Sequence, residues 1–222
     1  MQDELLGVGA RARLLSVNVG TPREFTWLGR TERSAIWKLP VEGPVDMHGV
    51  NMAGDDQADR SVHGGPDKAV YAYSSEDEAW WEEQLGRPLG PAPFGENLTL
   101  EGVDVTDALI GERWKVGDAL FEVCQPRVPC WKLGVKMGDA AFPPKFAAAG
   151  RPGAYLRIVH EAPVAAGDPL HIVYRPSHGV TVGDIAYIYH KDHSRAYIFL
   201  ELPELAETWL PWARKMVAHR QR

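Results

Sequence analysis

The residues best suited to chemistry lie in the segment 125–132, which reads Gln-Pro-Arg-Val-Pro-Cys-Trp-Lys. A single thiol, Cys130, stands there in a proline-stiffened loop with a cation on each side, Arg127 and Lys132. The thiolate is the form of cysteine that attacks or binds a metal, and nearby cations favour it by lowering the pKa of the thiol. Many cysteines that form no disulfide are simply small core residues. The cationic loop favours a reactive or metal-binding thiol over that alternative.

A second segment with polar groups occupies residues 62–71 and reads Val-His-Gly-Gly-Pro-Asp-Lys-Ala-Val-Tyr. The glycine pair, Gly64 and Gly65, allows the backbone to approach a ligand closely and to expose its N–H groups. His63 and Lys68 could hold an anionic or hydrogen-bonding group. Taken alone, the glycines and the proline are equally typical of a tight turn, and His63 could be a structural histidine.

A third segment, Phe-Gly-Glu-Asn-Leu-Thr at 94–99, places a carboxylate and the amide of Asn97 at the start of an expected strand. An ordinary strand entry is the alternative. Structural zinc is not expected, because Cys124 and Cys130 stand six positions apart without a second pair of ligands. A serine hydrolase is not expected either, because the chain has no Gly-x-Ser-x-Gly motif.

Short apolar runs separated by Gly, Pro and Asp dominate the chain as far as about residue 175. Their length and their content of β-branched and aromatic residues predict strands. Many short strands with few long helical patterns favour a closed or nearly closed β-barrel over a parallel doubly wound sheet. The fold class we predict is therefore mainly β. The predicted strands cover 14–19, 69–73, 97–100, 119–124, 155–160 and 170–174.

Three helices are predicted between the strands. One is capped by Ser75, with Glu78 three residues on in a capping box, and it is stopped by Gly86. Its residues are mostly polar, so it should lie on the surface. Shorter helices at 130–137 and 143–149 would flank the mouth of the cysteine loop.

The pattern changes to helical after residue 177. Thr181 can cap a helix whose apolar residues follow the i, i+3, i+4, i+7 spacing, 195–201 form a second candidate, and Pro211 suits the first turn of a third. We therefore divide the chain into a β-barrel domain, 1–177, and a helical extension, 178–222. The extension is too short for a core of its own and should pack against the barrel or a second copy in a homodimer.

Composition sets broad limits. The chain has 222 residues, 45% hydrophobic, and a net charge of −6, which argues against a general nucleic-acid binder. The first ten residues do not form a secretory signal, and no apolar run reaches the roughly 18 to 20 residues that span a bilayer. Two cysteines make no disulfide framework. We expect a cytoplasmic protein, with small molecules or proteins rather than membranes as partners.

The three segments in this order, followed by Arg-Pro-Ser-His-Gly-Val-Thr-Val at 175–182, resemble the MOSC domain family and in particular its YiiM-like branch. The resemblance covers essentially the whole chain, including a three-helix carboxy-terminal extension. It implies a MOSC-type β-barrel, of the pyruvate-kinase-like kind, related to the carboxy-terminal domain of molybdenum cofactor sulfurases.

The resemblance also implies a function. In catalytic members a cysteine thiolate binds the molybdenum of the molybdenum cofactor (molybdopterin), and N-hydroxylated compounds such as 6-hydroxylaminopurine are reduced to amines. Cys130 occupies the matching position. Cationic groups would offset the charge of the cofactor, and backbone amides would lie near its phosphate or pterin. His63 and Asn97 are expected to form hydrogen bonds or to relay protons. The residues expected at the cofactor are Cys130, Arg127, Lys132, His63, Gly64, Gly65, Lys68 and Asn97.

The resemblance also implies a partner protein, and it leaves two alternative functions open. The chain has no iron–sulfur module of its own, so catalysis would require a separate flavin or iron–sulfur reductase as electron donor. The first alternative is a non-catalytic module that carries the cofactor, or sulfur as a Cys130 persulfide. The second is an interaction protein that dimerises through its helical extension.

Overall fold

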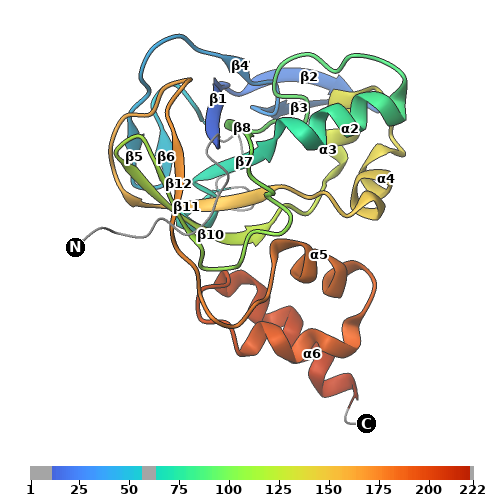
Figure 1. The fold of residues 1–222 in the computed structure, drawn as a ribbon. Coiled ribbons are helices and arrows are strands. Elements are labelled where there is room, and N and C mark those ends of the chain that lie inside the picture. The colour runs from blue at the N-terminus through green and yellow to red at the C-terminus, as the bar shows by residue number, and fades with distance from the viewer. Residues whose placement is uncertain (1–11, 57–63, 221–222) are drawn as a thin grey trace, which may run out of the picture.

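The computed structural model describes residues 12–56 and 64–220 and is built around one mixed sheet of eight strands (Figure 1). The strand order is β12-β9-β10-β11-β7-β8-β1-β4. Every neighbouring pair is antiparallel except β7 and β8, which are parallel. The strands are β1 (Arg13–Val19), β4 (Leu39–Pro40), β7 (Val70–Ser74), β8 (Leu98–Glu101), β9 (Arg113–Val116), β10 (Ala119–Pro126), β11 (Ala154–His160) and β12 (Leu170–Tyr174).

Two small hairpins lie outside this sheet. The first pairs β2 (Arg23–Trp27) with β3 (Arg30–Ser34), and the second pairs β5 (Met47–His48) with β6 (Asn51–Met52). The strands expected from alternating apolar residues are all present, with ends that match the predicted ones or differ by one or two residues. The hairpins, β4 and β9 were not predicted, because their sequences are short or largely polar.

The predicted closure into a barrel is not confirmed. Between the start of β1 and the start of β12, one isolated bridge joins Arg13 and Pro169, and no longer ladder connects these strands in the described part of the chain. The flanking hydrogen bonds, Leu14 N to Asp168 O and Leu170 N to Ala12 O, are both 2.9 Å long. The fold is thus a mixed eight-stranded sheet with several helices.

Helix α2 (Ser75–Leu85) differs from its prediction in two respects. Its cap is Ser74, whose Oγ accepts a hydrogen bond from the backbone of Asp77, so the prediction of Ser75 as the cap is wrong. The helix ends as predicted at Gly86, which has a φ of +64°. It is not wholly a surface helix, because Trp81 is buried and stacks on Phe146 at 5.7 Å.

Two further helices pack with α2 around the contact between Trp81 and Phe146. They are α3 (Trp131–Met137) and α4 (Phe142–Ala149), and they confirm the two short helices expected around the cysteine loop. A single turn of 3-10 helix, η1 (Pro66–Lys68), precedes β7. Figure 1 shows α2, α3 and α4 on one side of the sheet, away from the carboxy-terminal helices.

The carboxy-terminal helices are α5 (Val182–His190), η2 (His193–Leu200), η3 (Glu207–Trp209) and α6 (Leu210–Arg220). The predicted cap, Thr181, forms a full capping box with Asp184. The helices pack on β10, where Trp209 Nε1 donates to Gln125 Oε1 at 2.9 Å. Their buried apolar residues belong to the same core as those of the sheet. The domain boundary at residue 177 stays a prediction.

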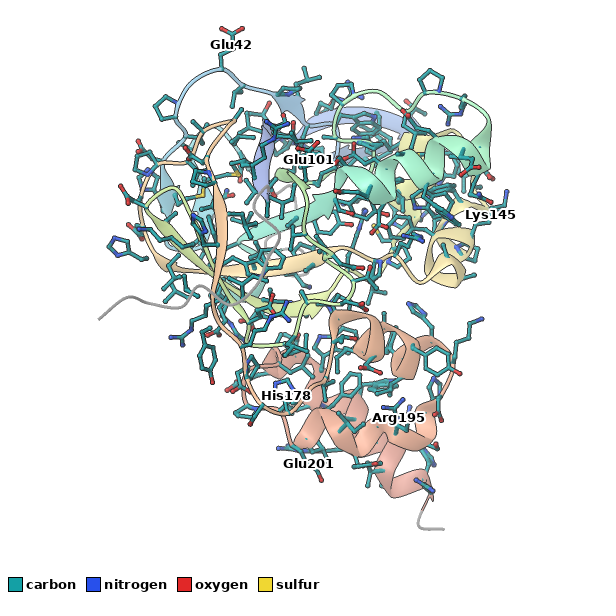
Figure 2. All side chains as sticks on the ribbon, viewed as in Figure 1. Glu42, Glu101, Lys145, His178, Arg195 and Glu201 are labelled. Carbon is teal, nitrogen blue, oxygen red and sulfur yellow. The ribbon has the colours of Figure 1, made fainter. Side chains whose placement is uncertain are left out.

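Figure 2 shows His178 on the loop that leads into these helices, Arg195 and Glu201 farther along this part of the chain, and Lys145 on α4 at the right-hand side of the molecule. His178 Nε2 lies 2.8 Å from the carbonyl oxygen of Ile110, which ties the start of the extension to the body of the protein. Within the described residues, every helix is too short or too polar to cross a bilayer.

Candidate functional site

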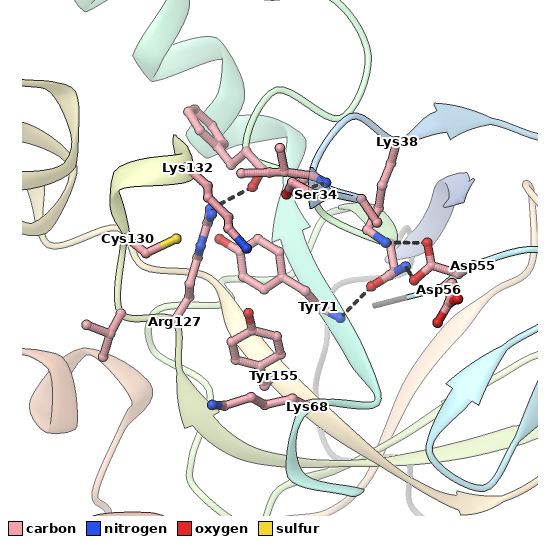
Figure 3. Close-up of a pocket in the computed structure, with 16 residues that line it drawn as sticks. Ser34, Lys38, Asp55, Asp56, Lys68, Tyr71, Arg127, Cys130, Lys132 and Tyr155 are labelled. Carbon is pink, nitrogen blue, oxygen red and sulfur yellow. Dashed lines mark hydrogen bonds and ion pairs between the residues drawn. The ribbon is translucent and has the colours of Figure 1, made fainter. Parts of the chain in front are cut away.

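A pocket opens beside the start of α3 and gathers residues from six parts of the chain (Figure 3). It offers about 710 Å³ of space free of protein atoms, part of it open to solvent. The lining residues are Ser34, Ala35, Ile36, Lys38, Asp55, Asp56, Lys68, Tyr71, Phe94, Gly95, Asn97, Arg127, Val128, Cys130, Lys132 and Tyr155.

Cys130 lies at one end of this pocket. It has an extended backbone (φ −112°, ψ 170°) as the residue just before α3, and it is half-buried. Figure 3 shows its sulfur pointing into the pocket, with Arg127 and Lys132 at the same end. Strand β10 ends at Pro126, which has no N–H with which to extend the pairing. The loop therefore leaves the sheet and presents the thiol to the pocket.

Arg127, a buried cation that lines the pocket, is fixed by three contacts. It is 6% exposed, and its Nη1 donates to the carbonyl oxygen of Phe94 at 2.6 Å. Its Cζ lies 5.1 Å from the ring centroid of Tyr71 and 5.7 Å from that of Phe146. A buried guanidinium keeps its charge. The pocket thus has one permanent, rigidly held positive charge near the thiol.

Two tyrosines form the middle of the pocket between its two charged ends (Figure 3). The rings of Tyr71 and Tyr155 lie 5.2 Å apart, and Tyr71 Oη donates to the carbonyl oxygen of Pro152 at 2.8 Å. Burial raises the pKa of both phenols. They are therefore neutral at physiological pH, and they supply planar apolar surface.

A buried ion pair between Lys38 and Asp55 lies at the opposite end (Figure 3). The side chains are 8% and 2% exposed. Burial lowers the pKa of Lys38, while Asp55 and nearby acids act to raise it. Asp55 Oδ1 also accepts from the backbone of Gly20 at 2.7 Å, and Oδ2 accepts from Asn97 Nδ2 at 3.0 Å. Both oxygens of this carboxylate are therefore engaged.

Asn97 lines the pocket, but its amide is used to hold the surrounding backbone. Its Oδ1 accepts from the backbone of Tyr71 at 3.1 Å. Its Nδ2 donates to the carbonyl oxygen of Asn18 at 3.2 Å as well as to Asp55. These bonds join β1, β7 and the entry to β8. A part for Asn97 in catalysis stays a prediction, and the contacts themselves describe a positioning side chain.

The structure brings together five of the eight residues expected at the site: Lys68, Asn97, Arg127, Cys130 and Lys132. Gly64 and Gly65 are not among the lining residues, so their contact with a cofactor stays a prediction. Gly65 has a φ of +92° at the turn that leads into η1, in keeping with the turn interpretation. His63 lies outside the described residues.

Sequence reasoning missed Lys38, Asp55, Tyr71 and Tyr155. A single lysine within the apolar run Ala-Ile-Trp-Lys-Leu-Pro-Val at 35–41 is the one sequence feature that marks Lys38 as unusual. The tyrosines alternate on strands that were predicted, but the strand pattern does not say which face meets a ligand. Asp55 could not be paired with Lys38 without the fold.

The second cysteine, Cys124, belongs to the core. It is fully buried, and its Sγ lies 3.2 Å from the carbonyl oxygens of Asp67 and of Tyr155. Burial raises the pKa of its thiol. It forms no disulfide with Cys130. Among the described residues, no cluster of three or more His, Cys, Asp or Glu side chains could by itself hold a metal ion.

Comparison with known proteins agrees with the resemblance seen in the sequence. The MOSC domain model matches residues 59–171. The uncharacterized protein YflK of Bacillus subtilis strain 168 is 38% identical over 90% of this chain and 91% of its own. Protein YiiM of Escherichia coli K12 is 33% identical over 79% of this chain and 81% of its own.

A fungal protein and a solved structure extend the comparison. A protein named reductase from Gibberella moniliformis is 31% identical over 73% of this chain, which corresponds to 29% of that longer protein. The crystal structure of YiiM from Geobacillus stearothermophilus aligns with a TM-score of 0.77 and 32% identity, covering 93% of this chain and 99% of that one. The chain therefore belongs to the MOSC domain family, in its YiiM-like branch.

Proposed function

We propose that this protein binds the molybdenum cofactor through Cys130 and reduces N-hydroxylated compounds to amines in the cytoplasm, with electrons from a separate reductase. The observation that carries the proposal is the placement of Cys130. Its thiol lines a pocket together with three cationic side chains, Arg127, Lys132 and Lys68. A thiol that were merely a core residue would need neither the pocket nor the charges.

The residues of the pocket fit this cofactor in three respects. Thiolate is a soft ligand, suited to a thiophilic metal. The pocket has one such ligand, Cys130, so the other ligands of the metal must come from the cofactor itself, as they do in a dithiolene. The cations would offset the charge of the anionic groups of a phosphorylated pterin, and the pocket is open to solvent, so a ligand can enter it.

When bound, the cofactor supplies the two-electron reduction of the N–O bond. The overall reaction takes a hydroxylamine, two electrons and two protons to an amine and water. The protein must hold Cys130 as a thiolate, and the fixed charge of Arg127 favours that form. Tyr71 and Tyr155 remain neutral and offer planar surface for a flat substrate or for the pterin.

Protons for the reaction need donors in the pocket. Lys68 and Lys132 both line it, and burial lowers the pKa of Lys68. A lysine whose pKa moves toward neutrality gives up its proton more readily than an exposed one. We assign Lys68 as the first candidate for proton delivery. The fungal relative named reductase supports a reductive reaction for this pocket.

The experiment measures metal and activity together. Protein from a cofactor-producing host is expected to contain about one molybdenum per chain and to reduce 6-hydroxylaminopurine with a chemical electron donor. Cys130→Ser should lose both while keeping its circular dichroism and melting temperature. Cys124→Ser is the matched control and should keep both. Molybdenum and activity retained in Cys130→Ser would refute the ligand assignment.

The same preparation separates the alternatives. Labile sulfur on Cys130 without molybdenum would identify a sulfur carrier instead of a reductase. Molybdenum bound without any reduction of N-hydroxylated compounds would identify a cofactor carrier. If the protein from a cofactor-producing host contains neither molybdenum nor labile sulfur, the remaining alternative is an interaction protein.

A further inference from the structure

Three ionisable side chains lie behind the pocket wall and have no part in the function proposed so far. They are Glu78 on α2, Glu96 just before β8, and Lys136 on α3. Glu96 is completely buried, although it lies in the segment 94–99 that the sequence marked as polar. None of the three lines the pocket. Buried charges are costly unless they are paired and hydrogen-bonded, so their presence needs a physical reason.

Lys136 joins helix α3 to two loops that shape the pocket. Its Nζ donates to the carbonyl oxygen of Ile36 at 2.9 Å, and it also donates to that of Ala92. Ile36 lines the pocket itself, and Ala92 lies two residues before Phe94, which also does. One ammonium group therefore fixes α3 against both loops. The residue just before α3 is Cys130.

Glu96 extends the same set of contacts to the cation beside the thiol. Its Oε2 accepts from the backbone N–H of Phe94 at 2.9 Å. The carbonyl oxygen of Phe94 in turn accepts from Arg127 Nη1 at 2.6 Å. The turn 94–96 is thus held from inside by the carboxylate and from the pocket side by the guanidinium.

The remaining carboxyl oxygens of Glu78 and Glu96 indicate how many protons the pair holds. Oε1 of each residue is buried and has no nitrogen or hydroxyl donor among the described residues. The two carboxyl groups are themselves in hydrogen-bonding contact. Two carboxylates would repel each other there, whereas a single proton between them satisfies both groups. With one proton, the charges of the two acids and of Lys136 sum to zero.

The titration behaviour agrees with this geometry. Burial, with Glu96 and Glu82 nearby, raises the pKa of Glu78 to about 9. Burial raises the pKa of Glu96 as well, but the hydrogen bond from Glu78 and the charge of Lys136 act to lower it. Burial also lowers the pKa of Lys136 to about 8, against the opposing effect of Glu96. The other charges that act on this lysine are the cations Arg127, Lys38 and Arg23, which lower its pKa further.

We propose that Glu78 is protonated at neutral pH and donates to an ionised Glu96, and that the pair forms with Lys136 a neutral buried triad that positions α3. The triad thereby sets the place of Cys130 and Lys132 relative to the pocket loops. Its members are positioning residues, since none of them lines the pocket. The use of Cys130 rests on the proposed function, but the triad itself does not depend on any metal.

The shared proton is tested by infrared spectroscopy of the cofactor-free protein at pH 7. The wild type is expected to show the carbonyl stretch of a protonated carboxyl group in a dry environment, and Glu78→Gln should lack it. Glu83→Gln, an exposed residue of the same helix, is the matched control and should keep the band. A wild type without the band, or a band unchanged in Glu78→Gln, overturns the shared proton.

The positioning role is tested by alkylation of Cys130 with iodoacetamide as a function of pH, in a Cys124→Ser background without cofactor. In Glu78→Gln the amide can still donate to Glu96, so the profile should stay within about twofold of the parent. In Lys136→Met and in Glu96→Gln the midpoint should move up by about one pH unit, because the thiol is no longer held beside Arg127. Lys215→Met, on the exposed face of α6, should leave it unchanged.

The two charged members should also be coupled. Lys136→Met leaves the charge of Glu96 buried and unpaired, so adding Glu96→Gln is expected to restore part of the lost stability. If Lys136→Met alone does not fold, Glu96→Gln and the double variant carry the test. Midpoints unchanged in the single variants, or fully additive effects in the double variant, overturn the positioning role. These readouts need no molybdenum, so a failed reductase assay would not affect them.

Discussion

The guanidinium of Arg127 lies over the ring of Tyr71, with its Cζ 5.1 Å from the ring centroid. The ring faces the pocket from β7 and the guanidinium comes from the end of β10, so this contact joins two strands that are not neighbours in the sheet. A cation over an aromatic face is stabilised by the ring quadrupole, most strongly when it is desolvated. The contact keeps a permanent charge beside Cys130, and among the described residues no acidic side chain forms an ion pair with this guanidinium.

The first prediction follows from this contact. Arg127→Met should slow the alkylation of Cys130 at pH 7 by about tenfold, because loss of a nearby charge moves thiol titration by roughly one unit. The pH profile of alkylation measures the effect directly. Arg113→Met removes an arginine that also lies over a tyrosine ring, at 5.6 Å, but far from the pocket in the strand order. An equal slowing in both variants would contradict a local electrostatic role.

The second prediction concerns the buried pair of Lys38 and Asp55. Removing one partner leaves an uncompensated charge in a dry site, so Lys38→Met should lower the free energy of unfolding by about 3–5 kcal/mol. The double variant Lys38→Met, Asp55→Asn should lose less than the sum of the two single changes. Urea denaturation measures all three. Arg13→Met, which breaks an ion pair with exposed partners, should have a much smaller effect. Additive losses of stability in the double variant would argue against an interaction between Lys38 and Asp55.

Much of the fold could be predicted from the sequence where local pattern and burial agree. Strands such as 119–124 and 170–174 alternate apolar residues toward one core, so their period reveals them. The hairpin of β2 and β3 was missed because Arg23–Trp27 and Arg30–Ser34 are mostly polar and exposed. The interrupted pairing of β1 with β12 near Pro169 depends on which strands become neighbours, and no local sequence pattern records that.

The candidate site divides in the same way. Cys130, Arg127 and Lys132 were predicted because chemistry and sequence neighbourhood coincide in one loop. The pairing of Lys38 with Asp55 joins residues seventeen positions apart across the pocket and is a product of tertiary structure. The shared proton of Glu78 and Glu96 also depends on tertiary structure, because the two acids hold one proton only when they are buried together.

The third prediction concerns pH and stability. The pKa of Glu78 is raised from its ordinary value of 4.5 to about 9 in the folded protein. Below pH 4.5 the folded and unfolded states bind the same proton, and above it the unfolded state loses that proton first. Stability should therefore fall as the pH rises toward 9. The lowered pKa of Lys136 acts with the opposite sign above about pH 8, so the clearest window is pH 5–7.5.

Glu78→Gln tests this dependence because it removes the titration and keeps a donor to Glu96. Over pH 5–7.5 its melting temperature should change less with pH than that of the parent, and its relative stability should grow as the pH rises. Differential scanning calorimetry at several pH values provides the measurement, with Glu83→Gln as control. Parallel curves for Glu78→Gln and the parent would show that Glu78 is ionised in the folded state.

The last prediction concerns the carboxy-terminal helices. Trp209 is 7% exposed, and its Nε1 donates to Gln125 on β10 at 2.9 Å. Gln125 also donates to the carbonyl oxygen of Asp67 at 2.6 Å, immediately before the pocket residue Lys68. Trp209→Ala should therefore lower the free energy of unfolding by about 3–5 kcal/mol. It should also hold Lys68 in the pocket less firmly. Deletion of 178–222 should abolish cooperative unfolding, because the core of the sheet continues into these helices.

Urea denaturation followed by tryptophan fluorescence measures both changes. Tyr187→Ala, on α5 and 56% exposed, is the control and should unfold like the parent. A truncated protein that unfolds cooperatively at the parent's midpoint would mean that the helices are an independent attachment. In that case the hydrogen bond from Trp209 to Gln125 would join two units that are each stable alone. The structure of the pocket would then not depend on the carboxy-terminal helices.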